Sequence, residues 1–138
     1  MMTNERLMAA VMIGVDPHKA SHTAVAVGAA EEPLGQLWVR ASAVQAERLV
    51  AWAVPWPERT WAIEGATGLG YLLAQQLVAA GEHVLDIQPK LGARVRLLAT
   101  GATNKNDPND ARSVAVAALL PPARRLVRAK DHAAVLRV

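Results

Sequence analysis

The chain has 138 residues, which is enough for one compact domain but not for two independent cores. Apolar residues make up 52% of the chain and charged residues 20%, a composition that excludes a disordered chain and predicts a core rich in Ala, Val and Leu. The chain contains no cysteine, which excludes disulfide scaffolds, thiolate zinc sites and cysteine nucleophiles and fits a cytoplasmic protein. No segment approaches the roughly 18 uninterrupted apolar residues of a membrane span, so no membrane partner is expected.

The net charge of +3 is unevenly distributed along the chain. Residues 1–89 contain five Lys/Arg and nine Asp/Glu, a net charge of −4, whereas residues 90–138 contain ten and three, a net charge of +7. An acidic part joined to a basic part suits a protein that holds cations at one site and polyanions beside it. A solvated basic helix near the C-terminus is an equally open interpretation.

The first forty residues predict three strands in a meander. The run 11–15 is apolar and β-branched, 20–27 shows alternation, and 36–40 follows Pro33 and Gly35. Helical spacing of apolar residues then predicts a helix over 43–54, with Ser42 as its N-cap and two prolines beyond its end.

From residue 60 onward, strands and helices alternate. The expected elements are a buried strand at 60–63, a helix at 69–80 closed by Gly81, a strand at 83–87, a helix from Pro89, and a last helix from Asp107 to about residue 120. The order βββαβαβαα predicts an α/β fold, a mixed five-stranded sheet flanked by helices. We expect residues 1–120 to form this domain and residues 121–138 to begin a helical linker that is cut short.

Four carboxylates are candidates for a shared site. Asp16 and Glu64 each end a predicted strand, and neighbouring strands would bring them together, because ligand sites in open α/β sheets lie beyond the strand ends. Asp107 and Asp110 share one face of the last helix. Converging carboxylates repel one another unless a divalent cation such as Mg²⁺ or Mn²⁺ neutralises them, which favours metal-assisted phosphoryl transfer. The alternative makes Asp16 a turn residue, Asp107 a helix cap and Asp110 a surface charge.

Three ordered motifs carry a family resemblance. They are Ile13-Gly14-Val15-Asp16-Pro17-His18-Lys19, Ile63-Glu64-Gly65-Ala66-Thr67-Gly68 and Asn104-Lys105-Asn106-Asp107-Pro108-Asn109-Asp110-Ala111-Arg112. Together they span roughly residues 11 to 120 and resemble the successive motifs of the DEDD transposases of insertion-sequence family 110.

The resemblance implies an RNase H-like fold of the RuvC type, with Asp16, Glu64, Asp107 and Asp110 as a tetrad that binds Mg²⁺. It implies metal-dependent DNA cleavage and strand exchange during transposition, in an expected homo-oligomer, a dimer or tetramer. In the family, a separate C-terminal domain carries a serine proposed as nucleophile, and a structured RNA can guide the pairing of target and donor. Both are expected partners of this chain.

Several basic residues are candidates for nucleic-acid contacts. Lys19 and Lys105 adjoin the proposed acids, and a basic face is expected further along the chain at Arg112, Arg124 and Arg125. Their alternative role is to keep turns and helix surfaces soluble. The four histidines have no metal-binding spacing, and the four tryptophans are expected in the core or at its rim, with base stacking as a lesser alternative.

Two other functions fit parts of the sequence. The chain could be a non-catalytic nucleic-acid-binding or oligomerisation module whose basic helices do the binding. It could also be a fragment of an actin-like or sugar-kinase ATPase, since that fold also opens with an apolar strand ending in Gly-x-Asp. Pro17-His18-Lys19 fits the second alternative poorly, because the ATPase hairpin holds phosphate with small and hydroxyl-bearing residues.

Overall fold

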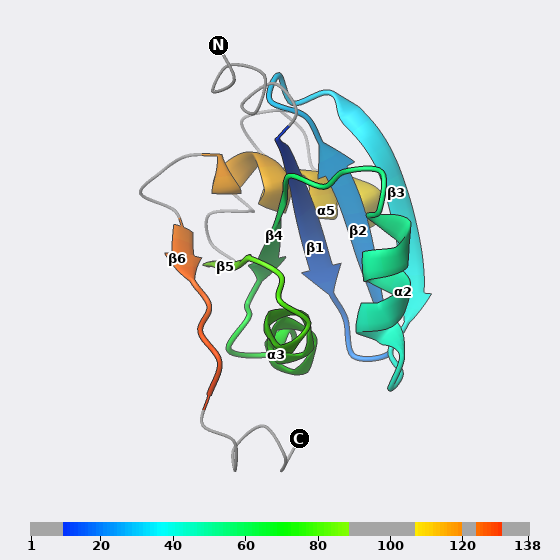
Figure 1. Ribbon diagram of the computed structural model, residues 1–138, viewed down its shortest axis with the longest axis vertical. Helices are drawn as coiled ribbons and strands as arrows, with labels where there is room; N and C mark the ends of the chain where they lie inside the picture. Colours follow the sequence, from blue (N-terminus) through cyan, green and yellow to red (C-terminus); the bar gives the residue numbers. More distant parts are fainter. Residues whose placement is uncertain (1–9, 89–106, 120–123, 131–138) are drawn as a thin grey trace.

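A six-stranded mixed sheet lies between two helical layers (Figure 1). The computed structural model describes residues 10–88, 107–119 and 124–130. Helices α2 and α3 lie on one face of the sheet, and α5 crosses the other (Figure 1). The strand order is β3-β2-β1-β4-β5-β6. In the described ranges no helix is long and apolar enough to cross a membrane.

The predicted meander is confirmed. It consists of β1 (Val11–Pro17), β2 (Ser21–Val27) and β3 (Pro33–Arg40), each antiparallel to the one before. Both central strands are buried along almost their whole length, whereas β3 is the edge strand and exposes most of its side chains. β3 begins three residues earlier than the sequence predicts, and its pairing with β2 shifts register between Ala26 and Val27.

Two parallel strands continue the sheet on the other side of β1. β4 (Arg59–Glu64) pairs with β1, and β5 (Val84–Ile87) pairs with β4. Parallel neighbours require crossover connections, and α3 supplies the one between β4 and β5. As a result, β1, β4 and β5 end at the same edge of the sheet, which is the lower edge in Figure 1.

The prediction of five strands was wrong by one. β6 (Arg124–Leu126) pairs antiparallel with β5, in a segment that the sequence analysis gave to a helical linker. The strand covers the otherwise unpaired edge of β5, and Val127 extends the pairing by donating its amide to the carbonyl of Val84 at 2.8 Å. Three residues are too few to show an alternating pattern, so only this distant partner defines the strand. The boundary at residue 120 stays a prediction.

The described helices are α2 (Gln45–Trp52), α3 (Tyr71–Ala79) and α5 (Asp107–Ala118). Ser42 is not the N-cap of α2: its hydroxyl accepts the amide of Val44, and Val44 precedes the helix with no side-chain cap. Gly81 adopts φ +87° after α3, which confirms its predicted place beyond the helix end. The helix predicted from Pro89 lies outside the described residues.

Side chains of each central strand alternate between two apolar cores. Ile13, Val15, Trp61 and Ile63 pack beneath α2 and α3. Met12, Val25 and Ala62 meet α5, which contributes mainly small residues to the second core. This alternation fixes which strand residues face α5.

Candidate functional site

Helix α5 approaches β1 most closely at Gly14. A Cβ atom at this position would lie 2.1 Å from the carbonyl oxygen of Ala111 and 2.5 Å from the amide nitrogen of Ala115. Only glycine permits such an approach of helix backbone to strand, so this residue sets the distance between the sheet and α5. Asp110, which is half-buried, directly precedes Ala111 in the same turn.

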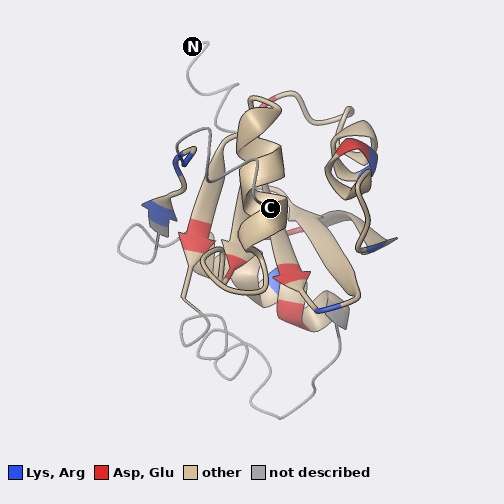
Figure 2. Cartoon of the chain, turned by 90° about the horizontal axis from the view of Figure 1, so that it is seen from below, with Lys and Arg blue, Asp and Glu red and all other residues tan. Residues whose placement is uncertain are grey.

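Asp16 and Glu64 lie at the carboxyl ends of adjacent parallel strands. Val15 of β1 is in register with Ile63 of β4, and the two acids are the next residue on each strand. Both belong to the face that meets α5, because Met12 and Ala62 on that face pack against the helix. Figure 2, which views the sheet from this edge, shows acidic positions at the strand ends. The predicted convergence of Asp16 and Glu64 requires β1 and β4 to be neighbours, and they are.

His18 contacts the first of these acids. Its Nε2 donates a hydrogen bond of 2.8 Å to Oδ2 of Asp16, which is only 8% exposed. The imidazole reaches back over Pro17, from the turn that connects β1 to β2. The sequence predicts no role for His18, and its only available signal is the i, i+2 spacing from the strand-ending aspartate.

The other two predicted acids belong to α5. Asp107 is its first residue, and its side chain lies outside the described part of the structure, whereas Asp110 is described. Among the described residues, no group of three or more His, Asp or Glu side chains is placed to hold a metal ion. The structure therefore places two of the four predicted acids at the ends of adjacent strands, and the tetrad itself stays a prediction.

The predicted basic residues are scattered. Lys19 is exposed in the turn after Asp16, close to the acidic edge. Arg112 approaches the β2–β3 turn, where its guanidinium lies 3.9 Å from a carboxylate oxygen of Glu31. Lys105 and the side chain of Arg124 lie outside the described residues, and Arg125 is exposed on β6.

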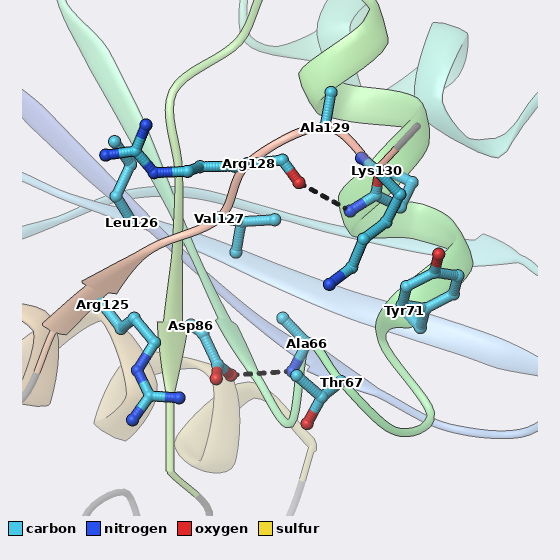
Figure 3. Close-up of a pocket in the computed structure, with 11 residues that line it drawn as sticks. Ala66, Thr67, Tyr71, Asp86, Arg125, Leu126, Val127, Arg128, Ala129 and Lys130 are labelled. Carbon is cyan, nitrogen blue, oxygen red and sulfur yellow. Dashed lines mark hydrogen bonds between the residues drawn. The ribbon is translucent and has the colours of Figure 1, made fainter. Parts of the chain in front are cut away.

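Arg125 lines a cavity of about 270 Å³ between α3 and the chain that follows β6, which we call the basic cavity. Three of the residues that line it are cationic: Arg125, Arg128 and Lys130. Gln75 of α3 fixes this segment, since its side chain donates to the carbonyl of Arg128 and accepts the amide of Lys130, both at 3.1 Å. Figure 3 shows the Lys130 side chain extended over the cavity and that of Arg128 turned away.

The opposite wall of the basic cavity is the loop after Glu64. The carboxylate of Asp86 accepts the amide of Ala66 at 2.9 Å, which ties this loop to β5 (Figure 3). The hydroxyl-bearing residues Thr67 and Tyr71 also line the cavity. The basic cavity thus adjoins the segment that carries Glu64. Lys130 is not among the predicted basic residues, because only the fold brings it to α3.

The sheet order, the crossover through α3 and the helix across the other face define an RNase H-like fold of the RuvC type. The solved structure of Thermus thermophilus RuvC is similar over 85% of this chain and 99% of its own, with 17% sequence identity and a TM-score of 0.61. T. thermophilus RuvC in complex with Holliday junction substrate gives 16% identity and a TM-score of 0.62 over 86% of this chain and 99% of its own.

The family follows from the sequence match. The model of the DEDD transposases of insertion-sequence family 110, described as Transposase, matches residues 13–138. The chain belongs to this family. No curated protein matches it. The predicted family is confirmed, and so is the predicted fold class apart from its strand count: the chain is a transposase domain with a RuvC-like fold.

Proposed function

We propose that this domain cleaves and exchanges DNA strands during transposition, with Asp16, Glu64, Asp107 and Asp110 as the catalytic tetrad. The observation that carries the proposal is the register of β1 and β4, which puts the first two acids on neighbouring strands and on the face covered by α5. The contact of Ala111 with Gly14 supports it, because this contact holds the turn that contains Asp110 against β1.

The residues present fit a hard divalent cation. Asp16 and Glu64 offer carboxylate oxygens, the ligands that suit Mg²⁺ and Mn²⁺, and neutralisation by a cation would offset their mutual repulsion. When bound, such ions activate the attacking water or hydroxyl and stabilise the oxygen that leaves the phosphodiester. The imidazole of His18 holds one oxygen of Asp16 and so orients the carboxylate.

Nucleic-acid contacts are proposed on both sides of this edge. Lys19 lies next to Asp16, and the basic cavity with Arg125 and Lys130 adjoins the loop after Glu64. Such cations bind phosphates irrespective of sequence. Lys105, Arg112 and Arg124 complete the proposed set. The similar RuvC structure solved with a Holliday junction supports DNA as the partner.

The remaining partners are proposed from family membership. They are a structured guide RNA, a C-terminal domain that contributes a serine nucleophile, and further copies of the chain in a dimer or tetramer.

The test compares strand cleavage and exchange by the full-length transposase with its element ends, guide RNA and Mg²⁺. Asp16→Asn and Glu64→Gln remove one negative charge each at nearly constant volume. We expect each to lower the rate at least about 100-fold, in line with the loss of a charged group that stabilises a transition state. Glu47→Gln, an exposed acid on α2, is the matched control and should keep full activity. Unchanged strand exchange in both site variants would remove the tetrad from the mechanism.

Calorimetric titration with Mn²⁺ or Mg²⁺ separates this proposal from a non-catalytic module. We expect heat of binding in the wild type and a marked loss in Asp16→Asn. No metal binding in the wild type, combined with salt-sensitive binding of nucleic acid, would favour the non-catalytic module.

A further inference from the structure

The edge strand β3 presents a row of exposed side chains beside the proposed active site. Gln36, Trp38 and Arg40 alternate with Leu37 and Val39, which pack into the core beneath α2. Gln36, Trp38 and Arg40 are all exposed. Trp38 is 53% exposed, whereas Trp61 is fully buried.

Trp38 lies in one cross-strand row with the acids. Thr23 of β2 is opposite Trp38 on one side and opposite Asp16 on the other, and Glu64 continues the row on β4. Directly paired residues point to the same face of a sheet. Two strand spacings separate the backbones of Asp16 and Trp38, about 10 Å.

Two cavities meet at Trp38. One, of about 280 Å³, is lined by Thr23, Gln36, Leu37, Trp38 and Pro108. Thr23 in its wall is 4% exposed, and its Oγ1 has no hydrogen-bond partner among the described residues. Such an orphaned hydroxyl is costly unless a ligand or water supplies a partner. The second cavity, of about 390 Å³, contains the cations Lys19 and Arg40.

We propose that Trp38 is the stacking platform for an unpaired nucleotide of the DNA strand being processed. The base stacks on the exposed indole, and the Thr23 hydroxyl and the Gln36 amide hydrogen-bond to its edge. Lys19 and Arg40, on the other side of the indole, take the adjoining phosphate. This stacking site rests on the proposed function, because the same DNA strand would continue to the proposed catalytic residue Asp16, whose backbone lies about 10 Å away.

An unpaired base fits this surface better than a duplex or an apolar protein segment does. In a duplex, both faces of each base are already stacked, so no face is free for the indole. An apolar segment would leave the orphaned hydroxyl and both cations without partners. A nucleotide supplies a flat ring, hydrogen-bonding edges and a negative charge, which match the three features of the surface.

The test measures binding of a labelled single-stranded DNA of about 12 nucleotides to the full chain by fluorescence anisotropy, with duplex and RNA of the same sequence as further arms. Trp38→Leu keeps an apolar side chain without a ring, and Trp38→Phe keeps a ring. We expect Trp38→Leu to weaken single-strand binding about 5-fold to 100-fold and Trp38→Phe to restore most of it. Duplex binding should change less than 2-fold in both. Leu34→Ala, also exposed on β3, is the matched control.

Equal binding of single-stranded DNA by the Phe and Leu variants would overturn the proposal. A Trp38-dependent effect on RNA alone would overturn the assignment to DNA. Asp16→Asn separates the stacking site from the catalytic site, since it should abolish cleavage without weakening the Trp38-dependent binding of single-stranded DNA. If Asp16→Asn cleaves normally while the Trp38 effects hold, only the proposed catalysis fails. If Asp16→Asn is inactive while Trp38→Leu binds normally, only the stacking site fails.

Discussion

The two faces of the sheet are built from the same strands for different purposes. Beneath α2 and α3, polar side chains bind one another: Glu82 accepts hydrogen bonds from Arg59 and Trp61, and Gln45 bridges His22 and Gln76. On the face that meets α5, polar groups gather at the strand ends and on β3. Because successive residues of a strand point to opposite faces, a single strand stabilises the fold with one set of residues and serves the site with the other.

The largest effect should come from Gly14, where the functional face depends on close packing. We expect Gly14→Ala to lower the free energy of unfolding by about 3 kcal/mol, because the new methyl group collides with the backbone of α5 rather than with a flexible side chain. The loss should appear in urea denaturation, and strand cleavage should fall with it, since displacement of α5 moves Asp110.

Gly68→Ala is the matched control for this change. Its Cβ would meet nothing closer than the carbonyl oxygen of Gly65 at 3.7 Å, an ordinary contact. A Gly14→Ala protein as stable as the Gly68→Ala protein would mean that α5 lies farther from β1 than the structure shows.

A smaller effect, confined to stability, should follow from changing Glu82 on the opposite face. Its carboxylate receives two hydrogen bonds from Arg59, at 2.8 and 3.0 Å, and one from the indole of Trp61 at 2.6 Å. Glu82→Gln loses the charge and one of the acceptor oxygens. We expect a loss of about 1–3 kcal/mol at neutral pH with no change in the rate of strand cleavage.

The pH dependence sharpens this prediction. Burial by itself raises the pKa of Glu82, but the hydrogen bonds from Arg59 and Trp61 outweigh it, and the pKa lies below its ordinary value. Its stabilising effect is therefore present at neutral pH and is lost as the pH falls through the folded-state pKa. The difference between wild type and Glu82→Gln should shrink in acid. A difference that grew in acid would contradict the assigned role of the carboxylate.

The sequence predicted the elements with strong local signals, and it missed what depends on distant partners. A continuous apolar run located β1, alternating residues located β2, and the strand ends located Asp16 and Glu64. The strand β6 exists only because β5 offers it an edge. The exposure of Trp38 depends on the position of β3 at the edge of the sheet. The contact of His18 with Asp16 depends on how the chain turns after Pro17. Composition and periodicity carry no information on such juxtapositions.

The smallest effect concerns His22, which lies on the same stabilising face as Glu82. Burial lowers its pKa, its Nε2 donates to the side-chain oxygen of Gln45 at 2.9 Å, and its buried Nδ1 has no partner among the described residues. Protonation would place a hydrogen on Nδ1 with no acceptor. The unfolded chain takes up this proton near the ordinary value of 6.5 and the folded chain only at lower pH, so stability declines as the pH falls below about 6.5.

His22→Gln keeps a donor toward Gln45 and removes the titrating group. We expect its melting temperature to fall less than that of the wild type between about pH 7 and about pH 5.5, the range in which an ordinary histidine titrates. An unchanged dependence in His22→Gln would mean that protonated His22 finds an acceptor, and the polar groups beneath α2 and α3 would then be less tightly fixed than their hydrogen bonds indicate.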